Sequence, residues 1–332
     1  MPKGLNQKEG AMSTPESGGA APPAKKLAAA DEDVLSVLFE RWDVLAEDED
    51  ILPPLSPLAS KLLAVEHEDA EAITELTQIV ESDPVLTGRI LGLANSVTIR
   101  ARSKPIFEVV GAVIRLGVNA VFEAAFAQVA ALWMRQNSQL PDPEQLHDLW
   151  LEYLITAFCA RQIVNRVEDN NVKISVAYAG GLLHDVGTLG LSAERPGPMS
   201  RFARAGYCYG TPLYERFVVA HTALGAALLK RWGIPEELSD VAAGHHAGFG
   251  IEQSPAAGII FVADHLHAQV LTHVRAKFKR ADAAVLGCFG GDLAQIEGAL
   301  GVLGLERDIT EIVERVASES ERIEVLAAAV SG

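Results

Sequence analysis

Cysteine, basic residues and long apolar runs are all scarce in this sequence, and each scarcity excludes a class of protein. The three cysteines, Cys159, Cys208 and Cys288, are far apart and odd in number, which argues against a disulfide framework and a paired-cysteine zinc site. Charged residues interrupt every apolar run well before it could span a bilayer, and the N-terminus lacks the apolar stretch of a signal peptide. We therefore predict a cytoplasmic protein without a membrane segment.

Acidic residues outnumber basic ones, with 44 Asp and Glu against 28 Lys and Arg and a formal net charge of -16. A surface of this sign repels phosphate backbones and acidic lipids, so direct binding of nucleic acid is not expected. The exception is a short basic stretch, Arg100, Arg102 and Lys104, which we interpret as solvated surface, with an anion or partner contact as the alternative. Hydrophobic residues make up 49% of the chain, which is enough for a packed core.

The first 50 residues differ in composition from the rest of the chain. Residues 1–30 are rich in Gly, Pro, Ser and Ala without apolar periodicity, so we predict a disordered tail. Residues 31–50 are predicted to form an acidic amphipathic helix that docks on the neighbouring domain, with pairing to a partner or a second copy as the alternative. Its apolar side chains recur at helical spacing and are Leu35, Leu38, Phe39, Trp42 and Leu45.

From residue 51 onward the pattern is helical, and no stretch alternates as a strand would. The prolines of LPPLSPL begin a new domain, and Asp83 before Pro84 predicts an N-cap with proline in the first turn. We expect an N-terminal helical part over 51–140, a larger helical part over 141–280 and a C-terminal helical extension over 281–332. The predicted helices of the first two parts cover residues 58–65, 70–81, 84–95, 107–135, 144–167, 175–191, 212–232, 235–246 and 254–279.

Histidines and aspartates cluster in the second half of the chain, where seven of the nine histidines lie. The adjacent pairs are His184 with Asp185, His245 with His246, and Asp264 with His265. Imidazole and carboxylate groups together hold Fe, Mn, Zn or Mg, and this mixture suits chemistry on phosphates. A divalent metal is therefore a candidate cofactor, although the pairs are tens of residues apart and their spacing alone does not define a site.

The segment GGLLHDVGTLGL around His184 and Asp185 resembles the signature helix of the HD superfamily of metal-dependent phosphohydrolases. The ordered set of motifs resembles the HDOD family, the HD-related output domains, more closely, over roughly residues 52–266. The motifs are LPPLSPLASKLL, SDPVLTGRILGLANS, AVIRLG, LWLEYLITA, GLLHDVG, AHTALGAALLKRWGIPEEL with the two histidines that follow it, and VADHL. The resemblance implies an all-α fold, with a multi-helix HD-like bundle preceded by a smaller N-terminal helical subdomain.

The resemblance also implies a set of metal ligands, one of which is changed. His184, Asp185 and Asp264 match the HD pair and the later aspartate of the superfamily. Additional ligands are implied at His221, His245 and His246. Glu152, in the motif LWLEY, stands where the superfamily has its first histidine, and Thr188 stands where the HD-GYP phosphodiesterases carry a lysine. We therefore expect a degenerate metal site.

Two interpretations of these groups stay open. They bind a divalent metal, with the carboxylate of Glu152 in place of an imidazole, or they satisfy one another in a buried hydrogen-bond network without an ion. The network would consist of His184, Asp185, His221 and Asp264.

The loss of one ligand favours a non-catalytic output module of bacterial signal transduction, which acts through contacts with a signalling protein in trans. No receiver, kinase or diguanylate cyclase signature is present in the chain, so the sensing function is expected to lie in that partner. The first alternative is a divalent-metal phosphohydrolase or phosphodiesterase acting on a nucleotide or a cyclic dinucleotide. The second is a nucleotide receptor without turnover, and a homo-oligomer is also a candidate assembly. We assign no catalytic residue from the sequence.

Overall fold

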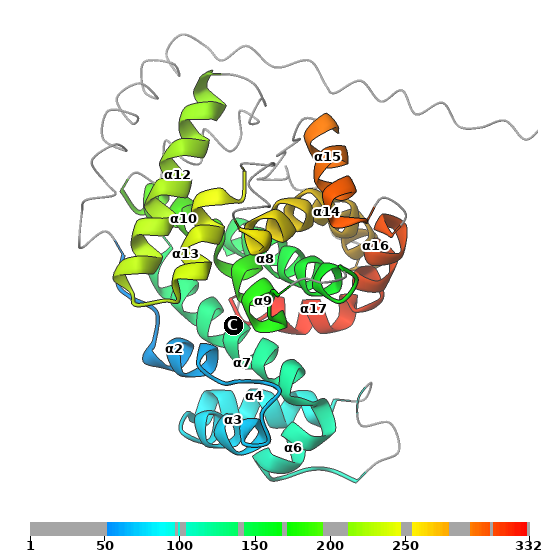
Figure 1. Cartoon of the computed structure of the whole chain (residues 1–332). Helices are drawn as coiled ribbons and strands as arrows, with labels where there is room; N and C mark the ends of the chain where they lie inside the picture. Colours follow the sequence, from blue (N-terminus) through cyan, green and yellow to red (C-terminus); the bar gives the residue numbers. More distant parts are fainter. Residues whose placement is uncertain are drawn as a thin grey trace, which may run out of the picture.

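The computed structural model describes residues 52–96, 99, 104–138, 143–167, 171–194, 212–246, 254–278, 293–305 and 308–330. The predicted disordered tail, the predicted acidic helix, Arg100 and Arg102 lie outside these residues. Within the described ranges every regular element is a helix and none is a strand, which confirms the predicted all-α fold (Figure 1). The boundaries of the three predicted parts stay a prediction.

The helices, in chain order, are α2 (Pro57–Leu63), α3 (Ala72–Glu81), α4 (Pro84–Ala94), α6 (Val109–Leu116), α7 (Val118–Asn137), α8 (Pro143–Val164), α9 (Ile174–Leu183), α10 (Val186–Glu194), α12 (Pro212–Arg231), α13 (Glu236–Gly244), α14 (Pro255–Phe278), α15 (Leu293–Leu303), α16 (Ile309–Ser318) and α17 (Ser320–Ala327). Helices α2, α3, α4 and α6 pack on α7 at the lower end of the molecule in Figure 1, and α7 in turn contacts α8, α9 and α17. Helix α7 therefore joins the small N-terminal group to the larger body.

Two helices begin with a side-chain cap followed by proline, and the cap of α4 is the one predicted from the sequence. The side chain of Asp83 accepts hydrogen bonds from the amides of Val85 (2.7 Å) and Leu86 (3.0 Å), with Pro84 in the first turn of α4. Ser56 caps α2 in the same way, ahead of Pro57. In both cases a side-chain oxygen satisfies amides that have no partner within the helix, and proline, which has no amide hydrogen, loses nothing.

Two of the predicted helices are each divided into two in the structure. The pattern over 107–135 predicted one helix, but the chain bends by 114° between α6 and α7 at Gly117, whose φ of 86° is readily adopted only by glycine. The pattern over 175–191 also predicted one helix, but α9 ends at Leu183 and α10 begins at Val186. His184 and Asp185 therefore lie at a junction, where their side chains can take different directions.

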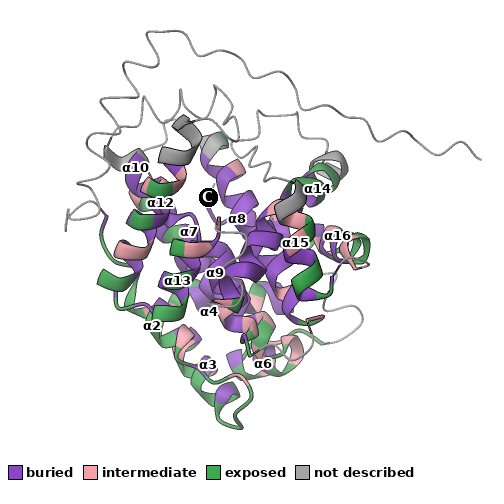
Figure 2. Ribbon diagram, turned by 45° about the horizontal axis from the view of Figure 1, so that its top comes forward, coloured by how far each residue is buried: buried purple, intermediate pink, exposed green. Residues whose placement is uncertain are grey.

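The core of the larger body is centred on α8, which packs against α9, α14, α16 and α17. Figure 2 shows the buried residues concentrated there and exposed residues along the outer helices. The side chains of Trp150, Phe158 and Tyr178 are almost completely buried in this core. Taken singly, none of the described helices is long and apolar enough to span a membrane; α6 and α7 meet that test only as a bent pair.

A buried ion-pair cluster ties the C-terminal helices to this core. The carboxylate of Glu123 on α7, which is 1% exposed, receives Nη1 of Arg161 at 3.0 Å and Nη2 of Arg322 at 2.6 Å. Glu319, between α16 and α17, pairs with both of these arginines, and both guanidinium groups lie over the ring of Phe158. The two carboxylates balance the two guanidinium charges where three helices meet.

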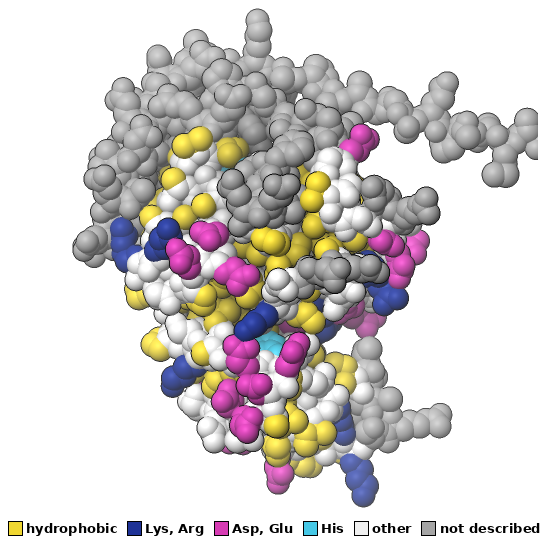
Figure 3. Space-filling model, in the orientation of Figure 1, with side chains coloured by type: hydrophobic (Ala, Val, Ile, Leu, Met, Phe, Trp, Pro, Cys, Tyr) yellow, Lys and Arg dark blue, Asp and Glu magenta, His cyan; other side chains and the backbone are white. Residues whose placement is uncertain are grey.

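Acidic side chains dominate the N-terminal face of the molecule. On the face shown in Figure 3 they gather over the N-terminal helices, and the exposed residues there include Glu66, Glu68, Glu71 and Glu75. Such a face would repel a phosphate backbone. This supports the expected absence of nucleic-acid binding, which stays a prediction.

Candidate metal centre

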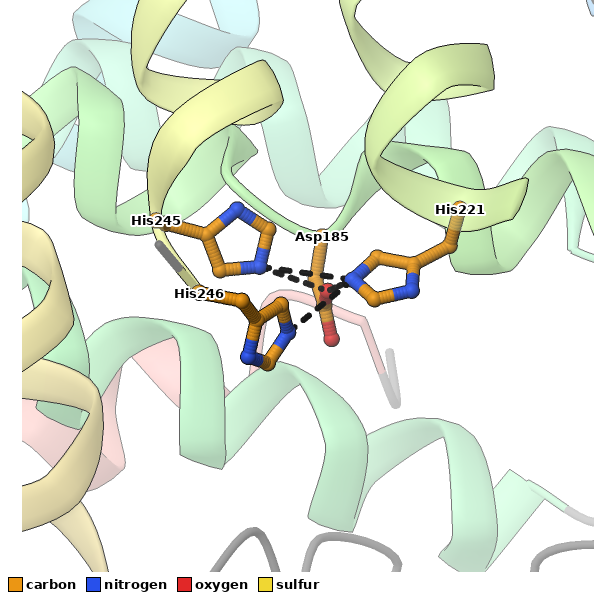
Figure 4. A group of neighbouring side chains, drawn as sticks. All are labelled: Asp185, His221, His245 and His246. Atoms are coloured by element: carbon orange, nitrogen blue, oxygen red, sulfur yellow. Dashed lines mark hydrogen bonds and ion pairs between the residues drawn. The ribbon is translucent and has the colours of Figure 1, made fainter. Parts of the chain in front are cut away.

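Four side chains from three separate segments converge at one buried point (Figure 4). Asp185 lies between α9 and α10, His221 lies on α12, and His245 and His246 follow directly after α13. One potential ligand atom from each residue lies within 4.8 Å of those of the other three. We call Asp185, His221, His245 and His246 the four-residue cluster.

The contacts within the four-residue cluster join nitrogen and oxygen atoms of the kind that ligate metals. The Nε2 atom of His221 lies 3.2 Å from Oδ1 of Asp185, and Nε2 of His245 lies 3.5 Å from the same oxygen. The Nε2 atom of His221 is also 3.4 Å from Nε2 of His245 and 3.1 Å from Nε2 of His246. Two imidazoles therefore turn Nε2 towards one carboxylate, and the third places its Nε2 beside that of His221.

For His221 and His245, backbone carbonyls determine which ring nitrogen carries the hydrogen. The Nδ1 atom of His221 contacts the carbonyl of Phe217 at 2.7 Å, and Nδ1 of His245 contacts that of Ala242 at 3.0 Å. Because a carbonyl can only accept a hydrogen bond, Nδ1 must donate, and Nε2 of a neutral ring is left with a lone pair. The two Nε2 lone pairs then face each other, which is unfavourable unless a positive charge lies between them.

Burial disfavours a proton on two of the three histidines of the cluster, His221 and His246. It lowers the pKa of His221 to about 4, because desolvation and the nearby His245 outweigh the attraction of Asp185. Burial likewise holds the pKa of His246 well below its ordinary value, and His245 and His221 add to the lowering. His221 and His246 are therefore neutral imidazoles beside a carboxylate, and a neutral imidazole is the form that ligates a metal ion.

A second group lies beside the four-residue cluster, and in this group protonated histidine balances the charge of a carboxylate. The Nε2 atom of His184 lies 3.6 Å from Oδ1 of Asp264, and Nδ1 of His267 lies 3.3 Å from the same oxygen. Burial by itself lowers the pKa of His267, but the hydrogen bond and charge of Asp264 outweigh it and raise the pKa to about 9. The pKa of His184 is also raised, against the effect of burial, by Asp264 and Asp185. Protonated imidazole thus balances the carboxylate in this group.

The structure places the seven predicted site residues in two groups. Asp185, His221, His245 and His246 come together. His184 and Asp264 pair with each other instead, and Glu152, buried on α8, acts on His267 through its charge. Whether any of the seven holds an ion stays a prediction.

His267 is the one member of these groups that sequence reasoning missed. It lies three residues after Asp264 on α14, close enough for its ring to contact both the side chain and the backbone carbonyl of that residue. Residues three apart on a helix share a face, so the spacing D-x-x-H was the available signal.

The glycines of GGLLHDVG allow the helices to approach closely enough to build the site. A Cβ atom on Gly181 would collide with the backbone of Ala157 on α8. A Cβ atom on Gly187 would collide with the backbone oxygen of His221 and lie 2.7 Å from the nitrogen of Gly225, both on α12. The missing side chains therefore set the distance between the HD pair and the helix that carries His221.

Replacing His267 by asparagine should remove a pH-dependent contribution to stability. The folded-state pKa of about 9 exceeds the ordinary value of 6.5, so proton binding to His267 favours the folded state. This stabilisation is complete below pH 6.5 and is lost as the pH rises through about 9. We expect the difference in unfolding free energy between wild type and His267→Asn to shrink over that range in urea denaturation. The exposed His273 provides the control variant His273→Asn. If the unfolding free energy of wild type exceeds that of His267→Asn by the same amount at pH 6 and pH 10, the raised pKa of His267 is wrong.

Comparison with known proteins agrees with this geometry. A family model of the HDOD domain matches residues 52–248, which is more than half of the chain. The chain belongs to the HDOD domain family. The matched region includes all four residues of the four-residue cluster, whereas Asp264 and His267 lie beyond it.

Individual HDOD relatives are distant in sequence. An uncharacterized protein of Treponema pallidum (strain Nichols) is 23% identical over 205 residues, which is 59% of this chain and 38% of that protein. A crystal structure from Marinobacter aquaeolei VT8, provisionally described as a signal transduction protein, matches with a TM-score of 0.63 at 21% identity, covering 92% of this chain and 66% of that one. An HDOD domain protein of unknown function from Geobacter sulfurreducens matches with a TM-score of 0.59 at 24% identity, covering 90% and 97%. The chain thus spans less than two thirds of the first two proteins, and the structural likeness shows a shared fold.

Proposed function

We propose that this HDOD protein is a signalling output module that holds one divalent metal ion in the four-residue cluster and acts through contacts with a signalling protein in trans. The Marinobacter structure, provisionally described as a signal transduction protein, supports the signalling role by analogy of fold. The single observation that carries the metal proposal is the convergence of one potential ligand atom from each of the four residues, with two Nε2 atoms on the carboxylate of Asp185 and Nε2 of His246 beside that of His221.

The composition of the cluster limits which metals fit it. Three imidazole nitrogens and one carboxylate oxygen suit zinc, iron or manganese, whereas magnesium and calcium prefer oxygen ligands throughout. The backbone carbonyls of Phe217 and Ala242 orient two of the rings, as carbonyls commonly do for histidines that ligate metals. The residues present therefore fit a borderline divalent ion.

Three features favour binding without hydrolysis. The cluster offers four protein ligands, which would close a tetrahedral zinc site, whereas catalytic zinc sites have three and keep one position open. Glu152, at the position of the first histidine of the superfamily, is not part of the cluster. His184 lies against Asp264 rather than completing the ligand set around Asp185.

Hydrolysis of a nucleotide or a cyclic dinucleotide is the second candidate function. The number of protein ligands favours this function if the bound metal is iron or manganese rather than zinc. Iron and manganese accept six ligands, so four protein ligands would leave two positions for a phosphate oxygen and water. In that case Asp185 and the three histidines would hold the ion, and the ion would supply electrostatic stabilisation of the phosphate. The metal's identity therefore separates the two candidates.

Metal binding can be tested directly by elemental analysis and titration. We expect one ion per chain in the purified protein. The variants His221→Ala and Asp185→Asn should bind the metal with an affinity lower by roughly a hundredfold or more. His273→Ala removes an exposed histidine of α14 and should leave the affinity unchanged. If folded His221→Ala binds as tightly as wild type, the four-residue cluster is not the metal site.

Turnover is tested separately. We expect no sustained hydrolysis of nucleotides or cyclic dinucleotides with Mn²⁺, Fe²⁺ or Zn²⁺ present. Turnover that disappears in Asp185→Asn, with the fold intact by circular dichroism, would replace the non-catalytic proposal by the phosphohydrolase.

A further inference from the structure

A pocket of about 270 Å³ lies on the N-terminal helices, away from the four-residue cluster. It is formed between the chain just before α2, the start of α4 and the C-terminal half of α7. Its principal walls are Pro53, Pro54, Asp83, Gln128, Leu132 and Trp133. This volume is below the roughly 300–1,000 Å³ of ordinary small-molecule sites, and it suits one or two large side chains better than a cofactor.

The apolar walls of the pocket are fixed in place and partly uncovered. The indole Nε1 of Trp133 donates a hydrogen bond to the carbonyl of Pro53 at 2.9 Å, which holds the ring against the chain before α2. Leu132 is 39% exposed and Val85, at the rim, is 53% exposed. Covering such side chains with another apolar surface would remove them from water and favour docking.

Two polar side chains in the pocket lack partners for some of their atoms. Gln128 is 7% exposed, yet within the described part of the chain its carboxamide makes no hydrogen bond. Both capping hydrogen bonds to Asp83 use Oδ1, and Oδ2 has no hydrogen-bond partner among the described residues. These polar atoms are therefore available to form hydrogen bonds with polar atoms of a group that enters the pocket.

We infer that residues 31–50 of the same chain dock in this pocket, with Trp42 as the main apolar anchor. The segment ends three residues before Pro53, which lines the pocket, so its C-terminal end must lie near the pocket. The eleven steps from Trp42 to Pro53 cover about 16 Å as a helix and about 37 Å when extended, which allows Trp42 to reach the pocket. The predicted apolar face of the segment supplies the matching surface.

The charges of the segment and of the pocket also match. Arg41 is the sole basic residue within 31–50, and it stands beside Trp42. Asp83 is the sole charged side chain among the described residues that line the pocket. A guanidinium group at Oδ2 of Asp83 would pair the two without disturbing the cap of α4.

Disulfide trapping tests the docking in the full-length chain. In a background with Cys208→Ser and Cys288→Ser, the pair Arg41→Cys and Val85→Cys should form an intrachain disulfide roughly tenfold faster than a control pair, because docking raises the local concentration of the two thiols. The control pair is Arg41→Cys with Ile114→Cys, which is also exposed but lies on α6 outside the pocket. Equal rates, or a disulfide that joins two chains, would overturn the inference.

Hydrogen exchange gives a second measurement that does not depend on engineered thiols. Amides within 35–45 should exchange slowly in wild type and roughly tenfold or more faster in Trp42→Ala. Val44→Ala, on the opposite side of the predicted helix, should leave the exchange unchanged. Rapid exchange in wild type, or the same change in both variants, would overturn the docking. Metal content should be unaffected in either variant, so this test is independent of the proposed metal site.

Discussion

Replacing Gly187 by alanine is expected to destabilise the protein by about 3 kcal/mol or more and to weaken metal binding at the same time. The added methyl group would collide with the backbone oxygen of His221 and crowd the nitrogen of Gly225. A backbone cannot rotate away as a flexible side chain can, so α10 and α12 must move apart. His221 lies on α12 and Asp185 directly precedes α10, so the separation acts on the four-residue cluster itself.

Urea denaturation measures the loss of stability, and metal titration measures the loss of affinity in the same samples. The matched control is Gly88→Ala on α4, where an added Cβ atom meets nothing within 4 Å. Because alanine favours a helix more than glycine does, Gly88→Ala should stabilise by about 0.5–1 kcal/mol. If Gly187→Ala is as stable as wild type and binds metal normally, the close approach of α10 and α12 does not determine the site.

Replacing Glu123 by alanine is expected to cost about 3–5 kcal/mol, because it leaves two largely buried guanidinium groups with one carboxylate between them. Glu123 accepts hydrogen bonds from Arg161 and Arg322 and is almost completely removed from solvent. Without it the two positive charges over Phe158 repel each other and pull on the helices they tie together. The C-terminal helices α16 and α17 should therefore detach most readily in this variant.

Denaturation of the metal-free protein gives the free energy of unfolding, and hydrogen exchange of 309–327 reports detachment of α16 and α17. Glu311→Gln is the control, since Glu311 pairs with Arg166 and Arg315 at the surface, where ion pairs contribute little. Replacing all four charged residues of the cluster, Glu123, Arg161, Glu319 and Arg322, by leucine or methionine should cost less than Glu123→Ala, because no charge of the cluster is then left unpaired. A loss below about 1 kcal/mol for Glu123→Ala would show that the cluster does not stabilise the fold.

Much of the helical layout was predictable because its signals are local. The Asp83–Pro84 start of α4 and the stop after α12 at Gly233, whose φ is 68°, depend on neighbours a few residues away. The bends at Gly117 and at His184–Asp185 were missed, because apolar residues continue through both points at helical spacing. At Gly117 a single glycine permits the bend, and the continuous apolar pattern hides that local signal. At His184–Asp185 distant packing, rather than local preference, decides where the helix stops.

The sequence by itself determined that the chain is helical, that it resembles the HDOD family and which imidazoles and carboxylates are candidate ligands. Only the tertiary structure decided how those candidates divide. His184 and Asp185 are neighbours in the chain, but one lies against Asp264 on α14 and the other against His221 on α12. Their partners are tens of residues away, and their positions depend on how closely α10 approaches α12 and α9 approaches α8 at single glycines. Residue type and spacing define which atoms can ligate a metal, whereas long-range packing defines which of them meet.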